Sequence, residues 1–517
     1  MECTCVRQTD LPNTTKLFSD LIYRFDRVAD LYPWKTNDLA SIEAAAKFDY
    51  PDDRRADLIR ALTPGNQGNP SLEILAQPGT VAIVTGQQVG LFSGPAYTVY
   101  KALSAIRIAR ELNARGTRAV PVFWLATEDH DFAEVNQAWV FGSDRRPVRL
   151  QADSPESSGT RPVGGLPLDS IPISELRAVL NGLPFAEEAA AIVERAYRPG
   201  ATMGEAFAAM VRELFAPYGL LIVDPMSPAI RKMAAPFMRT AVERMPELIG
   251  AVIAKSKELV ERGYHAQVLV DAKTSLAFLL ENGHRTTLKR TGYSLGELAD
   301  KGESLSPNAL LRPVLQDYLL PTAAYVGGPA ELAYFAQSRV IYDRLLGRQP
   351  VAAPRSSFTL LDARSAKHAA KYGLGFTDLF TEESVLREKI ADRVTPPSLA
   401  GRLNRTASSI AAALDALEAD LKHFDVSLAA ALGTSRGKIE YQAAKIARKT
   451  RAQMLVKDAQ ASRDAASLSG LAYPEGHLQE RLYSIVPFLA AFGPGLIGEL
   501  YEHVRIECPD HQVAVLS

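Results

Sequence analysis

Short runs of apolar and β-branched residues recur along the first two thirds of the chain. They cover residues 81–84, 120–126, 220–223 and 321–326, and such runs are typical of strands buried on both faces of a parallel sheet. Between the first two runs lies a segment with helical spacing that extends to about Asn113. A strand-helix-strand crossover of this length makes the flanking strands parallel. The pattern therefore predicts an open α/β sheet.

Two stretches interrupt this alternation, and we interpret them as insertions at about 151–215 and 264–310. The first is rich in Ser, Gly and Pro from Ser154 to Pro167 and continues with helices. The second has short segments at 267–270, 275–280 and 285–288 that predict antiparallel strands. Its Asn282-Gly283 pair suits a tight hairpin.

From about Glu382 the pattern changes to long helices without strands. Apolar residues recur every seven positions in two offset series, as in a coiled coil; they are Leu403, Ile410, Leu417 and Phe424, and Ala407, Leu414, Leu421 and Leu428. Gly433 to Gly437 should break the helix, and helical spacing resumes at Ile439. An antiparallel hairpin follows, whose exposed flank could pack on a second subunit.

These patterns divide the chain into four parts. We expect a mostly helical N-terminal part of the core at 1–75, the sheet core with its insertions at 76–375, a coiled-coil hairpin at 376–470, and an apolar segment at 471–517 that docks on the core. A chain of 517 residues is too long for one ordinary core, in agreement with several units.

Charge and composition narrow the class of protein. The 58 basic and 59 acidic residues leave a formal charge of −1, which gives no general reason to bind nucleic acid or an anionic membrane. Neither residues 1–13 nor the apolar stretch 485–498 has the pattern of a signal peptide or a membrane span, so we expect a cytoplasmic protein. Cys3, Cys5 and Cys508 make neither a disulfide framework nor a zinc site, and we expect reduced thiols.

The loop after the first strand, Gly86 to Pro95, is rich in glycine and leads into a helix. Ser93 or Gly94 can cap that helix, and Pro95 can take its first position. Such a loop points N-H groups at an anion, although it matches neither a Walker loop nor a dinucleotide-binding pattern and a simple packing turn is the alternative. Lys101, nearly two turns further on, either reaches back to a ligand or is solvated.

The loop after the second strand crowds Glu128, Asp129, His130 and Asp131 together, which suits general acid-base work. The alternative is helix capping by Asp131, with Glu134 three residues on. No second histidine or carboxylate cluster accompanies this loop, so no metal site is predicted.

Other strand ends deliver further charged residues. Because the carboxyl ends of parallel strands meet at one edge of a sheet, Asp224 and Glu331 could converge on the same crevice. Arg312 and Arg355 are candidate clamps for a carboxylate or phosphate, with surface salt bridges as the alternative.

Several segments together resemble the BshC family, the cysteine ligases of bacillithiol biosynthesis. They are Gly86 to Leu91, Ser93 to Thr98, Lys101, Pro121 to Trp124, Glu128 to Asp131, Leu311 to Pro313, Leu320 to Thr322, Gly328 to Glu331 and His511 to Val513. The resemblance spans nearly the whole chain. It implies a Rossmann-like core similar to nucleotidyltransferases, two connecting insertions and a C-terminal coiled coil associated with homodimers.

The resemblance also implies a reaction, the joining of the cysteine carboxyl group to the amine of glucosaminyl malate. A free carboxylate acylates an amine only after activation, so ATP with Mg is a hypothesis, although the chain has neither a Walker loop nor the signature motifs of adenylating synthetases. The alternatives are a nucleotidyltransferase-like enzyme with another acceptor and a non-catalytic coiled-coil scaffold.

Candidate site residues follow from the two loops and the other strand ends. Asp129 and His130, with Glu128 and Asp131 beside them, are expected to deprotonate the amine or orient cysteine. The residues expected to hold substrate or phosphate are Gly86, Gln87, Gln88, Ser93, Gly94, Tyr97, Lys101, Arg312 and Glu331.

Overall fold

The computed structural model describes residues 1–153, 159–288 and 292–516, which form two compact units. Unit 1 comprises Met1–Ser143, Val148–Thr359 and Glu480–Ala514. Unit 2 comprises Asp144–Pro147, Leu360–Gln479 and the last residues from Val515. Ser154, at which the sequence opens the first insertion, lies outside the described residues. Within the described ranges, no helix combines the length and apolar character that a membrane crossing needs.

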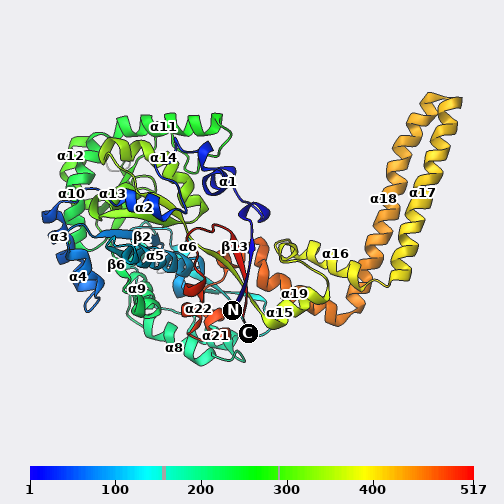
Figure 1. The fold of residues 1–517 in the computed structure, drawn as a ribbon, viewed down its shortest axis with the longest axis horizontal. Helices are drawn as coiled ribbons and strands as arrows, with labels where there is room; N and C mark the ends of the chain where they lie inside the picture. Colours follow the sequence, from blue (N-terminus) through cyan, green and yellow to red (C-terminus); the bar gives the residue numbers. More distant parts are fainter. Residues whose placement is uncertain (154–158, 289–291, 517) are drawn as a thin grey trace. The chain divides into compact units, whose positions relative to one another are not determined.

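The centre of unit 1 is a five-stranded parallel sheet with the order β11-β10-β2-β3-β6. Its strands are β2 (Val81–Gln87), β3 (Ala119–Leu125), β6 (Leu221–Val223), β10 (Thr322–Gly327) and β11 (Val351–Pro354). Figure 1 labels two of these strands, β2 and β6. The four strands expected from apolar runs are confirmed. The pattern missed β11, because its Val-Ala-Ala-Pro sequence is short and weak in strand propensity.

Successive side chains of the central strands enter two separate apolar layers. In β2, Ala82 and Val84 pack into one layer, and Val81 and Ile83 into the other. The first layer includes side chains of α1 (Lys16–Tyr23), α3 (Asp52–Leu62), α4 (Ser71–Ala76), α10 (Pro228–Glu243), α11 (Met245–Glu261), α13 (Arg312–Leu319) and α14 (Pro329–Leu345). The second includes those of α2 (Leu39–Ala45) and α5 (Tyr97–Ala114). Helices on both faces of a parallel sheet confirm the predicted Rossmann-like α/β class.

Helix α5 begins later than the sequence predicts. Residues 92–94 have φ values of 51°, 75° and 65°, so the backbone turns through the left-handed region before a helix can start. Ala96 is the N-cap and Tyr97 the first helical residue. The prediction that Ser93 or Gly94 caps this helix, with Pro95 in its first position, is therefore wrong.

The two predicted insertions contain different kinds of structure. The first carries α7 (Ile173–Leu180), α8 (Ala186–Ala196) and α9 (Met203–Phe215). The second carries the antiparallel sheet β8-β7-β9 and α12 (Leu295–Asp300), with β7 at Ala277–Glu281, β8 at His284–Thr287 and β9 at Leu305–Pro307. Asn282 and Gly283 have positive φ, which confirms the hairpin turn. The strand predicted at 267–270 is wrong, because the side chain of Gln337 instead bonds the backbone N-H and C=O of Val268 at 2.9 and 2.8 Å.

Smaller elements complete the description. A three-stranded sheet has the order β1-β13-β12, and β1 lies in a stretch that the sequence predicts to be mostly helical. Its strands are β1 (Glu2–Val6), β12 (Ser357–Asp362) and β13 (His511–Leu516). The remaining elements are β4 (Gln137–Phe141), β5 (Pro147–Gln151), α6 (Phe132–Val135), α20 (Gln479–Leu482), α21 (Val486–Phe492) and α22 (Leu496–His503).

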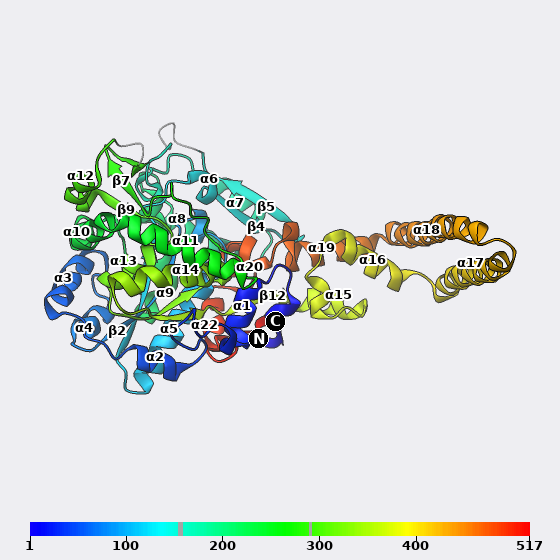
Figure 2. The ribbon, with the colours of Figure 1, turned by 90° about the horizontal axis from the view of Figure 1, so that it is seen from above.

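Unit 2 is built around a long antiparallel helical hairpin of α17 (Pro397–Phe424) and α18 (Val426–Lys457), which lie side by side in both views (Figures 1 and 2). Its other helices are α15 (Ala363–Lys371), α16 (Glu383–Val394) and α19 (Ala459–Ala472). The predicted hairpin is confirmed, but the break predicted at Gly433–Gly437 is wrong. The chain turns at Asp425, which is extended and accepts a hydrogen bond from the backbone N-H of Ser427 at 2.7 Å. A helix tolerates its glycines at a cost of about 1 kcal/mol each, whereas an N-cap aspartate starts a helix.

Candidate functional site

A cavity of about 510 Å³ opens at the carboxyl ends of β2, β3 and β10, within unit 1. This edge of a parallel sheet is where open α/β folds bind ligands. The sheet and its loops contribute Gly86, Gln87, Gln88, Trp124, Ala126, Glu128, Asp129, Glu134 and Gly328 to the lining. Helix α5 contributes Tyr97 and Lys101, α13 contributes Arg312, and α14 contributes Pro329, Ala330, Glu331 and Tyr334. Phe278, Arg285, Pro307, Asn308 and Ala309 come from the second insertion, and Arg355 and Arg481 complete the wall.

Gly86 lets two strands approach closely at the floor of this cavity. It is paired with Trp124 of β3, and a Cβ atom at Gly86 would lie only 2.9 Å from the carbonyl oxygen of Trp124. Glycine is therefore required by the contact between strands, and the loop serves packing as well as ligand access.

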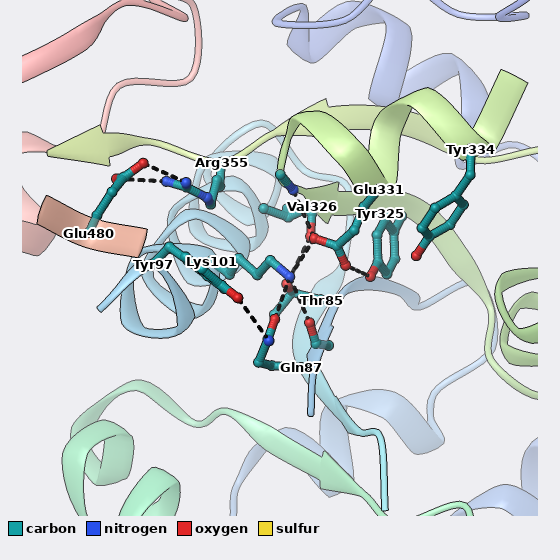
Figure 3. A network of polar contacts seen from close by, with 12 residues as sticks. Thr85, Gln87, Tyr97, Lys101, Tyr325, Val326, Glu331, Tyr334, Arg355 and Glu480 are labelled. Atoms are coloured by element: carbon teal, nitrogen blue, oxygen red, sulfur yellow. Dashed lines mark hydrogen bonds and ion pairs between the residues drawn. The ribbon is translucent and has the colours of Figure 1, made fainter. Parts of the chain in front are cut away.

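Lys101 projects from α5 into the floor of the cavity and is only 2% exposed (Figure 3). Its ammonium group donates to the carbonyl oxygen of Gly86 at 3.0 Å and to Oε1 of Gln87 at 2.8 Å, and it forms an ion pair with Glu331. These contacts occupy the three N-H donors of a lysine. Burial lowers the pKa of Lys101, although Glu331 opposes this change. The alternative of a solvated Lys101 is therefore wrong, and its contact with a ligand stays a prediction.

Glu331 connects Lys101 to Tyr325 and also caps α14. Its carboxylate accepts from the N-H of Gly328 at 2.9 Å and from the hydroxyl of Tyr325 at 2.7 Å. Burial raises the pKa of Glu331, but Lys101 and the Gly328 N-H outweigh burial and hold it below that of an ordinary glutamate. The side chain is still 20% exposed, so the ionised carboxylate faces the cavity.

Arg312 also lines the cavity and is held by two tyrosines. Its guanidinium donates to the hydroxyl of Tyr334 at 2.7 Å and to that of Tyr325 at 3.5 Å. Burial opposes its charge, but Tyr334, Tyr325 and Glu331 together raise the pKa of Arg312, so it stays a cation. A cation held by neutral hydroxyls is available to an anionic ligand.

The acidic loop gives Asp129 a different environment. Its carboxylate accepts from the Gln88 amide at 2.7 Å and from the His130 N-H at 2.7 Å. Burial raises the pKa of Asp129, but these two hydrogen bonds and the nearby Arg285 outweigh burial. The pKa of Asp129 therefore lies below that of an ordinary aspartate. Gln88 also bonds Glu134 at 2.8 Å, which places two carboxylates at this end of the cavity.

Glu128 and Asp131, the neighbours of Asp129 and His130, have other contacts. Glu128 forms an ion pair of 2.6 Å with Arg231, and burial raises its pKa against the influence of that arginine. Asp131 accepts from the N-H of Glu134 at 3.2 Å and caps α6, the bonding that the capping alternative describes. Asp131 does not line the cavity.

His130 lies behind the cavity wall. Its Nδ1 atom is 3.2 Å from the guanidinium of Arg285, and its ring lies against Phe278. An arginine can only donate, so this contact makes Nδ1 an acceptor and leaves the proton on Nε2. In that tautomer His130 orients Arg285, and it would need to turn before it could accept a proton from a substrate.

Three other residues singled out from the sequence lie away from the cavity lining. Ser93 and Gly94 form the turn before α5, where the N-H of Ser93 donates to the hydroxyl of Tyr197 at 3.2 Å. Asp224 accepts from the hydroxyl of Thr127 at 2.6 Å and supports the acidic loop from behind. The expected convergence on one crevice therefore holds for Glu331 but not for Asp224.

A second buried network supports the wall behind Arg355. Its guanidinium forms a bidentate pair with Glu480, in which Nη1 lies 2.8 Å from Oε2 (Figure 3). Glu480 also accepts from the hydroxyl of Ser357 and the N-H of Phe358 at 2.9 and 3.0 Å. Burial lowers the pKa of the adjacent His511 to about 4, so this imidazole is neutral near pH 7.

Sequence reasoning missed several residues of the lining, among them the polar residues Arg285, Tyr334 and Arg481. Tyr334 lies three residues after Glu331, so helical spacing could have placed it on the same face. Arg285 and Arg481 carried no such signal, because they reach the cavity from a hairpin in the second insertion and from α20. Within the described part of the chain, Arg481 has no ion-pair partner, so its charge is available to a ligand.

Comparisons with known proteins agree with this architecture. Residues 1–356 match the family described as "Bacillithiol biosynthesis BshC, N-terminal Rossmann-like domain", and residues 358–516 match "Bacillithiol biosynthesis BshC, C-terminal coiled-coil domain". The chain is 52% identical to a protein of Solibacter usitatus, over 100% of both chains. It is 35% identical to a protein of Koribacter versatilis, over 98% of this chain and 99% of the relative. Both relatives carry the name "Putative cysteine ligase BshC". The matched domains and these relatives cover essentially the full length, and the chain belongs to the BshC family.

Proposed function

We propose that this protein is a cysteine ligase that joins the carboxyl group of cysteine to the amine of glucosaminyl malate, in the last step of bacillithiol synthesis. The cavity at the carboxyl edge of the sheet carries this proposal, because the segments that resemble the family supply most of its wall. Membership of the BshC family and the name of the relatives support the same reaction. A coiled-coil scaffold without catalysis would have no use for such a cavity.

The charges around the cavity suit these substrates. Asp129 and Glu134 form an acidic end that can hold an ammonium group of cysteine or of the amino sugar. Arg312 and Arg481 can hold carboxylates, of which the malate part has two. When the amide bond forms, a C-N bond replaces one C-O bond of the cysteine carboxylate. The ammonium group of the amino sugar gives up two protons, and the displaced oxygen leaves as water or, after activation, on a phosphate group. The chain's own contribution is to orient both groups for this attack.

Activation of the carboxyl group is the part that ATP would supply when bound. Arg312 and Arg481 fit a phosphate as well as a carboxylate, since both are anions that accept hydrogen bonds from a guanidinium. Within the described residues, no group of three or more His, Cys, Asp or Glu side chains is arranged to hold a metal ion. Both ATP and magnesium are varied in the assay that tests this function.

The test is a mass-spectrometric assay of purified protein with cysteine and glucosaminyl malate, with and without ATP and magnesium. Product formed only with ATP supports activation by a nucleotide, and no product under any condition counts against the proposed reaction. Asp129→Asn is expected to lower kcat/KM about 100-fold, because it removes the ionised group that positions the substrate ammonium.

Asp131→Asn is the matched control, because asparagine caps a helix as well as aspartate and Asp131 does not line the cavity. It should stay close to wild type. Equal losses in the two variants would assign the effect to the loop and not to the charge of Asp129. A His130→Gln variant with undiminished product would remove the proposed base role of His130.

We also propose that the hairpin of unit 2 pairs two chains into a homodimer. Large apolar side chains are exposed along it, namely Leu417, Phe424, Val426, Leu428, Ile439, Tyr441, Ile446 and Val456. An apolar groove of about 540 Å³ also opens between α17 and α18. Exposed apolar surface of this extent is typical of an interface with another protein, and a second copy of a heptad hairpin fits it.

Leu417→Asp is expected to halve the mass measured by light scattering, because a charge would be buried in the apolar interface. The matched control is Leu269→Asp in unit 1, where leucine is 86% exposed and far from the hairpin in sequence. An unchanged mass for Leu417→Asp would exclude the exposed apolar side chains around Leu417 as the contact between the two chains. Loss of the dimer in both variants would point to a general effect of the added charge.

A further inference from the structure

The three cysteines of the chain meet in unit 1, although they come from its two ends. Cys3 and Cys5 lie on β1, two residues apart and therefore on the same side of the strand. Cys508 lies shortly before β13. Besides burial, the thiol of Cys508 raises the pKa of Cys5, because it lies close to it. The guanidinium of Arg505, three residues before Cys508, lies 3.9 Å from the sulfur of Cys5. All three thiols are free in this structure.

The backbone around this pair is held in place from both sides. β1 and β13 are neighbours in one sheet. The amide of Gln8 donates to the carbonyl oxygen of Pro509 at 3.0 Å, and the hydroxyl of Tyr23 bonds the carboxylate of Asp510. These contacts fix the segments that carry Cys5 and Cys508 beside each other. The two sulfur atoms are therefore brought together by the fold and not by a chance encounter of loose ends.

The pair is open to small reagents. Cys5 is exposed and Cys508 is partly exposed. Burial raises the pKa of Cys5, while Arg505 acts in the opposite direction. A thiol with a raised pKa reacts slowly at neutral pH, so the pair should rest in the reduced state and respond only to a sustained oxidant.

We propose that Cys5 and Cys508 form a reversible disulfide, with the disulfide of a low-molecular-weight thiol as the oxidant. One cysteine thiolate attacks the small disulfide and forms a mixed disulfide, which releases one small thiol. The second cysteine then attacks the protein sulfur of that mixed disulfide and releases the other small thiol. Two protein thiols become one disulfide, and one small disulfide becomes two thiols, so electrons and protons balance.

This bond would join the N-terminal strand to the C-terminal segment and close a loop of almost the whole chain. Cross-links that close long loops restrict the unfolded chain most, so the oxidised protein should unfold at a higher temperature than the reduced protein. The inference concerns only the thiol pair and does not depend on the proposed ligase reaction.

The test is incubation of the full-length protein with cystine, followed by intact-mass measurement and by peptide mapping without reductant. Wild type should lose about 2 Da and yield one peptide pair joined through Cys5 and Cys508. Cys3→Ser is the matched control and should behave as wild type. Cys5→Ser and Cys508→Ser should each stop at the mixed disulfide, with a gain of about 119 Da.

Three results would overturn the proposal. They are a wild-type protein that retains the cysteine adduct, a cross-link that involves Cys3, and a loss of about 2 Da that persists in Cys508→Ser. Dithiothreitol should restore both the reduced mass and the lower unfolding temperature of wild type. A mass loss that resists this reductant would exclude a reversible disulfide.

Discussion

Replacing Lys101 by methionine is expected to lower kcat/KM of the ligase reaction about 100-fold. The ammonium group touches the carbonyl oxygen of Gly86, the amide of Gln87 and the carboxylate of Glu331, which all belong to the cavity lining. Methionine fills a similar volume but makes none of these contacts. The three groups would move apart, and a displacement of about 1 Å is sufficient for a loss of this size.

A second variant separates this positioning role from stability. Lys101→Met leaves the carboxylate of Glu331 without its cation, whereas Lys101→Met with Glu331→Gln removes both charges. The double variant should regain most of the lost stability and stay inactive. Recovery of kcat in the double variant would mean that Lys101 acts only through the fold. Lys257→Met, at a lysine that is 78% exposed on α11, is the control for the substitution itself and should keep full activity.

The central sheet could be predicted from the sequence because its signal is local. Each buried strand is a short apolar run, and the proline at the first position of α10 and of α14 marks where a helix begins. The hairpin of unit 2 was predicted for the same reason, but its turn was placed eight or more residues too late. Glycines at 433 and 437 looked like a break, whereas the side chain of Asp425 makes the actual one.

The candidate site could be predicted only in part. The loops at 86–90 and 127–131 were identified because parallel strands must end at one edge. Which residues of these loops are held by other side chains could not be foreseen. Glu128 forms an ion pair with Arg231, and His130 contacts Arg285; both arginines are distant in sequence. The burial of Lys101 likewise depends on Glu331, which a different strand-helix junction delivers. Partners of this kind are fixed by packing, and no local pattern records them.

Replacing Glu480 by glutamine is expected to lower the free energy of unfolding of unit 1 by about 3–5 kcal/mol. Glu480 is 1% exposed and accepts hydrogen bonds from Arg355, Ser357 and the N-H of Phe358. Glutamine has the same shape, but it leaves the charge of Arg355 buried without a counter-ion. The NH2 group of glutamine is itself a donor, so it would face the donors of Arg355, Ser357 or Phe358 and could not accept their hydrogen bonds. Burial raises the pKa of Glu480, but Arg355 outweighs this effect and lowers the pKa, so Glu480 is ionised in the native protein. The substitution by glutamine therefore removes a negative charge.

The unfolding of unit 1 can be followed by tryptophan fluorescence, because the three tryptophans, at positions 34, 124 and 139, all lie in that unit. Glu247→Gln at an exposed ion pair with Arg244 is the matched control and should leave the denaturant midpoint near that of wild type. The decisive comparison is Glu480→Gln with Arg355→Met and Glu480→Met combined. Removing both charges should cost less than removing one, since a buried ion pair gains little over apolar packing while a single buried charge is severely unfavourable. If the combined variant is instead the less stable, the hydrogen bonds to Ser357 and Phe358, and not the charge of Arg355, account for the role of Glu480.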